Sequence, residues 1–129
     1  MASAEMVFQN CLFTHGAAGI APLAANDYDN RVTGCLFFRL RIALLSHLGN
    51  FYLSDSRFQE SAQLDIQAPV HALSVRRVVS VGSAQFLDAS GGEIGASMVL
   101  SELLVHNWSA PAAITSSLPG PFQLLDATF

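Results

Sequence analysis

Polar and apolar side chains alternate from Arg57 to Gln67, which is the clearest local pattern in the chain. One parity is entirely polar and the other mainly apolar: Gln59, Ser61, Gln63, Asp65 and Gln67 alternate with Phe58, Glu60, Ala62, Leu64 and Ile66. A period of two residues is typical of a β-strand with one face toward a core and one toward water. We therefore predict one strand here, with Asp65 and its polar neighbours on the solvent-exposed face.

The same period recurs over the nine residues from Leu36 to Leu44. One side is apolar and the other includes two arginines: Leu36, Phe38, Leu40, Ile42 and Leu44 stand against Phe37, Arg39, Arg41 and Ala43. The pattern predicts a strand that buries its leucine-rich side. The arginines are then either exposed to solvent or paired with acidic residues on a neighbouring strand.

A third β-rich run follows Pro69 and extends from Val70 to Val81. Its odd-numbered residues are mostly apolar and are predicted to face inward, with Arg77 as the exception. A buried arginine needs a carboxylate or several carbonyl oxygens around it. We therefore expect the strand to twist or bulge at Arg76–Arg77, which would take Arg77 out of the core.

Glycine-rich residues 88–93 predict a turn between Phe86–Leu87 and the apolar run that follows, as in a hairpin. The run from Gly95 to Trp108 is apolar on both sides if it is a strand, although its leucines could also form a helical stripe. We favour a long strand buried on both faces. These elements predict an all-β fold, namely an antiparallel β-sandwich or jelly-roll-like domain of about six to eight strands with at most one short helix.

We assign residues 1–108 to this β-rich domain and residues 109–129 to a proline-containing C-terminal arm. Prolines at 111, 119 and 121 interrupt regular structure in the arm. Its Leu124, Leu125 and Phe129 are costly to leave in water. We therefore favour an arm laid on a neighbouring subunit as an added strand over a disordered end.

Charge is scarce along the whole chain. Charged residues make up 12% of the 129 residues, against roughly 25% in ordinary proteins, and lysine is absent. A folded monomer of 13.8 kDa exposes roughly 6,600 Å², so its sixteen charged side chains leave about one per 400 Å². A homo-oligomer that covers part of this surface is the simplest explanation, although serine, threonine and amide side chains could wet it instead.

The sequence also argues against several classes of function. Without lysine there is no Schiff base, no P-loop and no serine–lysine dyad. A net charge of −4 argues against a nucleic-acid partner, no apolar run reaches the ~18 residues of a membrane helix, and the N-terminus lacks the pattern of a secretory signal. Cys11 and Cys35 could pair, but core filling is the more common role of such cysteines.

Candidate chemistry is sparse. Histidines 15, 47, 71 and 106 lack metal-ligand spacing, so we expect neither a metal nor a cofactor. Asp27 and Asp29 are more consistent with an exposed turn than with a calcium site. Glu60 is the best candidate acid for a small barrel enzyme, but we favour an ion pair with Arg39 or Arg41, or an edge position.

We therefore predict a non-enzymatic structural subunit that self-assembles, as in a shell, an appendage or a virion. Its expected interface is apolar and comprises Met98, Leu100, Leu103, Val105, Phe122, Leu124, Leu125 and Phe129. The alternative is a ligand- or carbohydrate-binding β-sandwich in which aromatic residues stack on sugars, with Tyr28, Tyr52 and Trp108 as the candidates.

Overall fold

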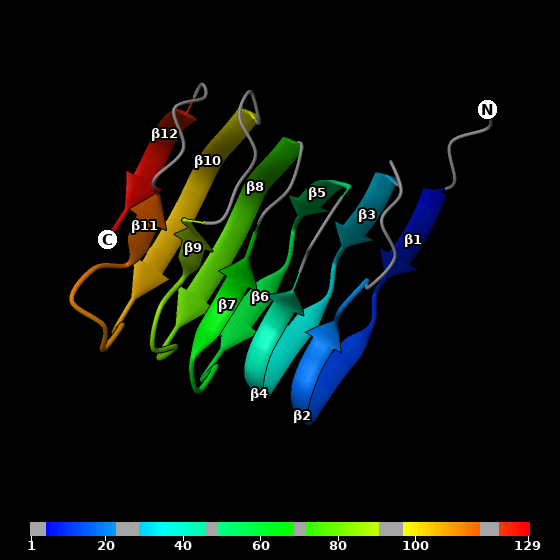
Figure 1. Cartoon of the computed structure of the whole chain (residues 1–129), viewed down its shortest axis with the longest axis horizontal. Coiled ribbons are helices and arrows are strands. Elements are labelled where there is room, and N and C mark those ends of the chain that lie inside the picture. The colour runs from blue at the N-terminus through cyan, green and yellow to red at the C-terminus, as the bar shows by residue number, and fades with distance from the viewer. Residues whose placement is uncertain (1–4, 23–28, 46–48, 69–71, 91–96, 117–121) are drawn as a thin grey trace.

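A computed structural model of the protein describes residues 5–22, 29–45, 49–68, 72–90, 97–116 and 122–129. These residues form twelve β-strands and no helix (Figure 1). The strands are β1 (Glu5–Gln9), β2 (Leu12–Ile20), β3 (Asp29–Thr33), β4 (Leu36–Leu45), β5 (Asn50–Ser54), β6 (Arg57–Gln59), β7 (Leu64–Gln67), β8 (Ala72–Val81), β9 (Leu87–Ala89), β10 (Ser97–His106), β11 (Ile114–Ser116) and β12 (Phe122–Thr128).

Every strand pairing in the described part of the chain is parallel, and the fold is a β-solenoid. Each turn of the chain lies beside the next, so that Glu5 pairs with Asp29 and Asp29 with Asn50, steps of 24 and 21 residues. The predicted antiparallel sandwich or jelly roll is therefore wrong. The hairpin predicted after Leu87 is also wrong, because β9 pairs in parallel with β7 and β11.

Equivalent residues in successive turns form rows along the stack, and two of these rows mark corners. Residues in both rows have a left-handed backbone, with φ of 50–65° in the first row and 53–72° in the second. The first corner row is Asn10, Gly34, Asp55, Arg77, Glu102 and Asp126, and the second is His15, Arg39, Glu60, Gly82 and Asn107. A single left-handed residue between extended segments turns the chain sharply.

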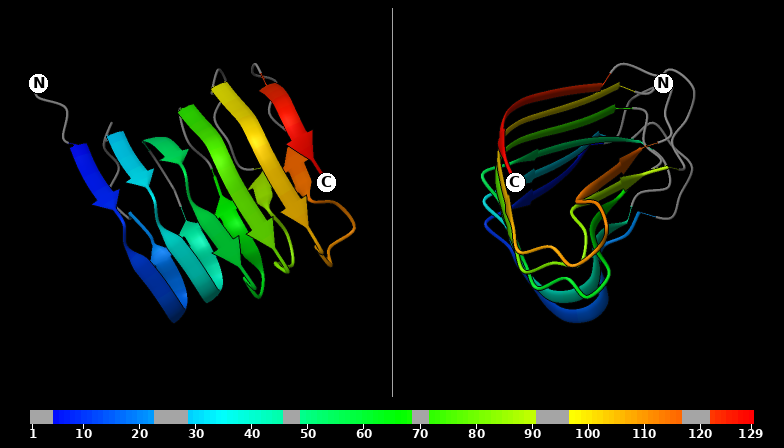
Figure 2. Two further views of the ribbon diagram at one scale, coloured as in Figure 1. Left: turned by 180° about the vertical axis from the view of Figure 1, so that it is seen from behind. Right: turned by 90° about the vertical axis from the view of Figure 1, so that its left-hand side faces the viewer.

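The corners divide each turn into three faces, as the view along the stack shows (right-hand panel of Figure 2). Face A holds β1, β3, β5 and the segments of β8, β10 and β12 that precede the first corner row. Face B is the segment of four residues between the two corner rows. Face C follows the second corner row and includes β7, β9 and β11.

Each corner also shifts the alternation of buried side chains by one residue. Phe37 and Leu40 are both buried although they are three residues apart, because Arg39 turns the chain between them. Phe38, which the strict period placed in the core, is only partly buried. The predicted single face of Leu36–Leu44 is therefore wrong before Arg39. After Arg39 the leucines and Ile42 are buried as predicted, but Ala43 on the opposite side is buried as well.

The expected break in the regular strand at Arg76–Arg77 is confirmed, but it is a corner and not a bulge, because the neighbouring turns have one residue at the same position. Arg77 has a φ of 51° and belongs to the first corner row. Val75 and Val78 are buried on either side of it, so Arg77 itself is exposed. The single strand predicted from Arg57 is interrupted in the same way at Glu60, which separates β6 from β7.

The interior is packed by pairing large side chains with small ones. Phe13, Phe37 and Phe58 stack in one inward row of face B, with ring centroids 5.0 and 4.9 Å apart. A Cβ at Gly19 would lie 2.7 Å from the carbonyl oxygen of Ala43 and 3.0 Å from the ring of Phe37, so the stack leaves room only for glycine there. Close packing of this kind requires complementary volumes across the core.

The run from Ser97 to His106 is a strand, as predicted, but only one of its sides is buried. Val99 and Leu104 on the other side are 36% and 42% exposed. Residues 114–116 and 122–128, which the sequence assigned to an arm, are β11 and β12 of the same solenoid.

Candidate functional site

Both ends of the stack present open strand edges. Within the described residues, β1 pairs only with β3 and β2 only with β4, while β12 pairs only with β10. The outer backbone N–H and C=O groups of these strands are thus free to pair with another strand. We call β1 with β2 the N-terminal edge, and β12 with Phe129 the C-terminal edge.

Exposed large apolar side chains gather at these two edges. Six of the eight in the described part of the chain lie there: Val7, Leu12, Phe122, Leu124, Leu125 and Phe129. Leu125 is 51% and Val7 62% exposed. Apolar side chains on an unpaired edge are the usual mark of a strand that can add to another sheet.

The two edges carry apolar residues in the same inward rows. Phe122 and Leu124 extend the rows of the buried Met98 and Leu100, and both remain 41% exposed because no strand follows them in the described structure. At the other end, Met6 and Phe8 begin the same rows, since they precede Asn30 and Val32. The inward rows that end at the C-terminal edge are therefore the same rows that begin at the N-terminal edge, and both edges carry large apolar side chains in them.

The predicted interface residues separate into two groups. Met98, Leu100, Leu103 and Val105 face inward on β10 and are buried in the core of this chain, so they offer no outer surface. The sequence pattern predicted that a second subunit would bury them, whereas in the structure the solenoid of the same chain buries them. The remaining four residues form the C-terminal edge: Phe122, Leu124, Leu125 and Phe129.

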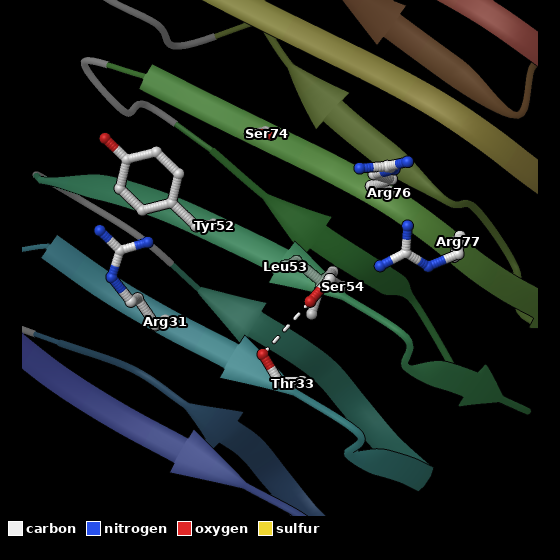
Figure 3. Close-up of a pocket in the computed structure, with 8 residues that line it drawn as sticks. All are labelled: Arg31, Thr33, Tyr52, Leu53, Ser54, Ser74, Arg76 and Arg77. Carbon is white, nitrogen blue, oxygen red and sulfur yellow. Dashed lines mark hydrogen bonds between the residues drawn. The ribbon is translucent and has the colours of Figure 1, made fainter.

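A polar groove of about 260 Å³ lies on the outer side of face A (Figure 3). It is lined by residues of β3, β5 and β8: Arg31, Thr33, Tyr52, Leu53, Ser54, Ser74, Arg76 and Arg77. The guanidinium carbon of Arg31 lies 4.7 Å from the centre of the Tyr52 ring, which fixes both side chains at one end of the groove. Thr33 and Ser54 are linked through their hydroxyl groups, 3.2 Å apart.

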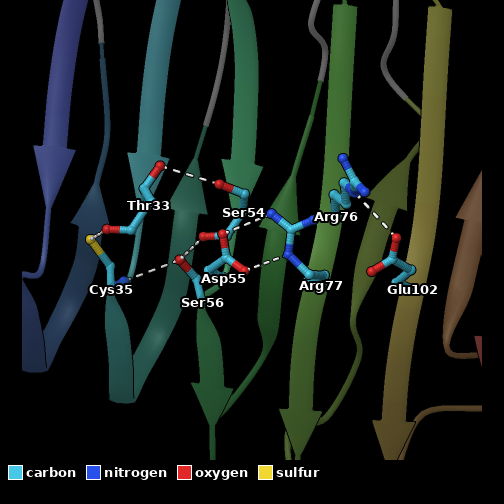
Figure 4. A network of polar contacts seen from close by, with 8 residues as sticks. All are labelled: Thr33, Cys35, Ser54, Asp55, Ser56, Arg76, Arg77 and Glu102. Atoms are coloured by element: carbon cyan, nitrogen blue, oxygen red, sulfur yellow. Dashed lines mark hydrogen bonds and ion pairs between the residues drawn. The ribbon is translucent and has the colours of Figure 1, made fainter.

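Ion pairs between turns hold the arginines of this groove (Figure 4). Arg77 donates two hydrogen bonds to Asp55, of 2.6 and 3.0 Å, and the Nε of Arg76 donates one to Glu102 at 3.2 Å. The hydrogen bonds from Arg77 hold the pKa of Asp55 below its usual value. Among the described residues, the terminal amino groups of Arg31 and Arg76 have no partner and remain available to an anion.

One carboxyl group is buried inside the solenoid. Asp65 follows Ala43 in an inward position of face C, and the Ser80 hydroxyl donates a hydrogen bond to its Oδ2. Its Oδ1 has no hydrogen-bond partner in the described structure. Burial raises the pKa of Asp65 to about 6, and the hydroxyls of Ser61, Ser80 and Ser83 only partly oppose that shift.

The solvent-exposed position predicted for Asp65 is thus wrong, because β7 is buried on both sides here: Leu64, Asp65 and Ile66 are all buried. No solvent reaches the carboxyl group, which is fully buried. The group can hold a proton within the core, but it cannot act on a ligand in the described state. We therefore treat it as a determinant of stability.

The three aromatic candidates are not brought together. Tyr28 lies outside the described residues. Tyr52 lines the groove on face A, whereas Trp108 follows the second corner and packs edge-on against Phe129, with 6.2 Å between ring centroids. Of the two candidates in the described ranges, Tyr52 is the one that lines the groove.

The remaining candidates are mostly structural. Glu60 accepts a hydrogen bond from Arg39 at 2.8 Å, which confirms the expected ion pair. His47, His71 and Asp27 lie outside the described residues, and Asp29 accepts a hydrogen bond from Asn50. Within the described ranges, no cluster of three His, Cys, Asp or Glu residues is arranged to hold a metal ion.

Comparisons with known protein families, with curated proteins and with solved structures found no match. No helix that could cross a membrane occurs in the part of the chain that the structure describes. The fold alone thus defines the class, a parallel β-solenoid. The function has to be argued from its edges and its outer faces.

Proposed function

We propose that the chain is a structural subunit that associates head to tail with further copies of itself through the two edges of the solenoid. The observation that carries this proposal is the concentration of exposed apolar side chains on β1, β2 and β12. A second copy would add its β1 to β12 as one more parallel strand. Backbone hydrogen bonds would then supply affinity and the side-chain rows would supply register.

The side-chain rows of the two edges are compatible in this arrangement. Continued along their rows, Phe122 would lie beside Met6 of the next copy, and Leu124 beside Phe8. Asp126 would lie beside Asn10 in the first corner row, so no like charges meet there. Different surfaces meet at each contact, which makes the association heterologous and open-ended and produces a filament unless the rotation closes a ring.

Light scattering coupled to size-exclusion chromatography tests this proposal with two matched variants. Leu124 and Leu104 are 41% and 42% exposed, but only Leu124 belongs to an edge. We expect the unmodified chain to elute as species larger than a monomer. Leu124→Glu should give a monomer, because the docked strand would bury the new charge, whereas Leu104→Glu should still associate.

An unmodified chain that stays monomeric at high concentration would exclude the proposal. The same oligomeric state in both variants would also count against it, since it would show that association does not depend on the edge.

A second candidate function is the binding of an acidic oligosaccharide in the groove of face A. The observation in its favour is the set of free guanidinium amino groups beside three hydroxyl groups and an aromatic ring. Carboxylate or sulfate groups suit the arginines, and the hydroxyls of Thr33, Ser54 and Ser74 suit the sugar.

A glycan array that contains carboxylated, sulfated and neutral oligosaccharides tests this second candidate. Arg76 and Arg39 are matched, because both side chains are 57% exposed and each forms one ion pair. Arg76→Ala should weaken binding to the acidic glycans about tenfold, as expected for loss of one charged hydrogen bond, and Arg39→Ala should not. An absence of hits, or equal binding of neutral glycans, would exclude a site of this kind.

A further inference from the structure

Cys11 and Cys35 occupy equivalent positions in neighbouring turns. Each directly follows a residue of the first corner row, namely Asn10 and Gly34. The backbone hydrogen bonds around them fix the register, since the Leu36 N–H donates to the Cys11 carbonyl at 3.0 Å and the Asn10 N–H donates to the Thr33 carbonyl at 3.0 Å. The two cysteines are therefore lateral partners in adjacent turns, Cys11 between β1 and β2 and Cys35 between β3 and β4.

That placement suits a disulfide. Adjacent strands lie about 4.8 Å apart, within the Cα separation of roughly 4.4–6.8 Å that disulfides span. Both cysteines belong to the inward row that continues through Ser56 and the buried Val78, so their Cβ atoms point the same way. Both thiols are free in the structure.

The two thiols differ in their access to solvent. Cys35 is 2% exposed and its Sγ lies 3.5 Å from the carbonyl oxygens of Phe8 and Thr33. Cys11 is only partly buried, and its Sγ donates to the Gln9 carbonyl. Burial raises the pKa of the Cys35 thiol, and the neighbouring Cys11 thiol raises it further. Cys11 is thus the thiol that an oxidant in solution reaches first.

We propose that Cys11 and Cys35 form an oxidation site at which a peroxide converts the two thiols into a disulfide between the first two turns. The Cys11 thiolate attacks one oxygen of hydrogen peroxide, which breaks the O–O bond, releases hydroxide and leaves a sulfenic acid on Cys11. The Cys35 sulfur then attacks the Cys11 sulfur, the S–O bond breaks, and water leaves. In sum, two thiols and one peroxide give one disulfide and two water molecules.

The disulfide would fasten the outermost turn to the body of the solenoid. It would join residues 24 positions apart, and closing a loop of that length restricts the unfolded chain. It would also hold β1 and β2 against the next turn, where one side of each strand has no partner in the described structure. This inference is independent of the head-to-tail proposal, because it concerns contacts within one chain.

Mass spectrometry of the folded chain after treatment with one equivalent of hydrogen peroxide tests the proposal. We expect a loss of about 2 Da, a Cys11–Cys35 peptide in a non-reducing digest, and a melting temperature raised by about 5–10 °C. Reduction with dithiothreitol should reverse all three changes.

Two single variants serve as controls. In Cys35→Ser, which has no resolving thiol, Cys11 should instead gain oxygen atoms or link two chains. In Cys11→Ser, the buried Cys35 should react much more slowly. The proposal fails if the unmodified chain gives only oxygen addition or only dimers between chains, or if the linked form melts at a lower temperature than the reduced form.

Discussion

Replacing Phe37 with alanine is expected to lower the free energy of unfolding by about 4 kcal/mol, within the range measured for buried phenylalanines. The ring is fully buried and stacks between Phe13 and Phe58 at centroid distances of 5.0 and 4.9 Å. Its loss would leave a cavity in a closely packed part of the core, where a Cβ at Gly19 would already lie 3.0 Å from the Phe37 ring. Neighbouring turns cannot close that gap without breaking their ladder of hydrogen bonds.

Phe38 supplies the matched control for this prediction. It is the same residue type one position further along β4, but it lies on the outer side, near the Arg39 guanidinium and the His15 ring. Phe38→Ala should cost about 1 kcal/mol or less. Urea denaturation followed by circular dichroism measures both values. A larger cost at Phe38 than at Phe37 would mean that the simple period of two runs through Arg39 and that the chain has no corner there.

Replacing Asp65 with asparagine is expected to raise the free energy of unfolding at pH 7.5 by about 3 kcal/mol. The pKa of the carboxyl group is about 6 in the folded chain and near 3.8 when unfolded, so the folded state holds the proton more tightly. Its contribution to stability is therefore fully present below pH 3.8 and is lost as the pH rises through 6. A difference of about two in pKa corresponds to about 3 kcal/mol.

Asparagine removes the buried charge and still offers Ser80 an acceptor, so the gain should shrink as the pH falls from 7.5 to 4.5. Asp55→Asn is the control with the opposite sign. The hydrogen bonds from Arg77 lower the pKa of Asp55, so its contribution is present above the unfolded value and is lost on acidification. Denaturation curves at pH 4.5, 6 and 7.5 measure both variants. A destabilising effect of Asp65→Asn at pH 7.5 would show that the charged carboxylate is preferred in the core.

Local alternation predicted most of the strands but not how they pair. The period of two residues is the same in parallel and antiparallel sheets, so Leu36–Leu44 could not distinguish a sandwich from a solenoid. The parallel stack is visible in the sequence only as matched rows, such as Phe13, Phe37 and Phe58 at steps of 24 and 21 residues. Because the steps are unequal, a fixed repeat does not emerge.

The corners could not be predicted from the sequence, because many of the residues that form them are not typical of a left-handed backbone. A left-handed backbone favours glycine or asparagine, yet Arg39, Glu60 and Arg77 adopt it here, at a cost of roughly 1 kcal/mol each. Their ion pairs across neighbouring turns, Arg39 with Glu60 and Arg77 with Asp55, help to hold them in place. The misfit at Arg77 was the one corner that the pattern of side chains revealed.

Candidate sites were harder to predict than strands. The apolar character of Leu124, Leu125 and Phe129 predicted contact with a neighbouring subunit. These side chains are 41%, 51% and 45% exposed in the single chain, and the interface itself stays a prediction. The groove of face A could not be found in this way, because Arg31, Tyr52 and Arg76 come from three different turns. Asp65 was misplaced because β7 is buried on both sides, whereas an alternation of polar and apolar residues predicts one buried side only.

Disulfide cross-linking at the two edges tests the proposed head-to-tail association most directly. With Cys11 and Cys35 replaced by serine, Val7→Cys and Gln123→Cys would place new thiols in one outward row, at opposite ends of the stack. Head-to-tail stacking brings residue 123 of one copy beside residue 7 of the next, so mild oxidation should give a ladder of covalent oligomers on a non-reducing gel. A chain with only one of the two new cysteines should stop at dimers. If the double variant also yields only monomers and dimers, the edges do not associate head to tail.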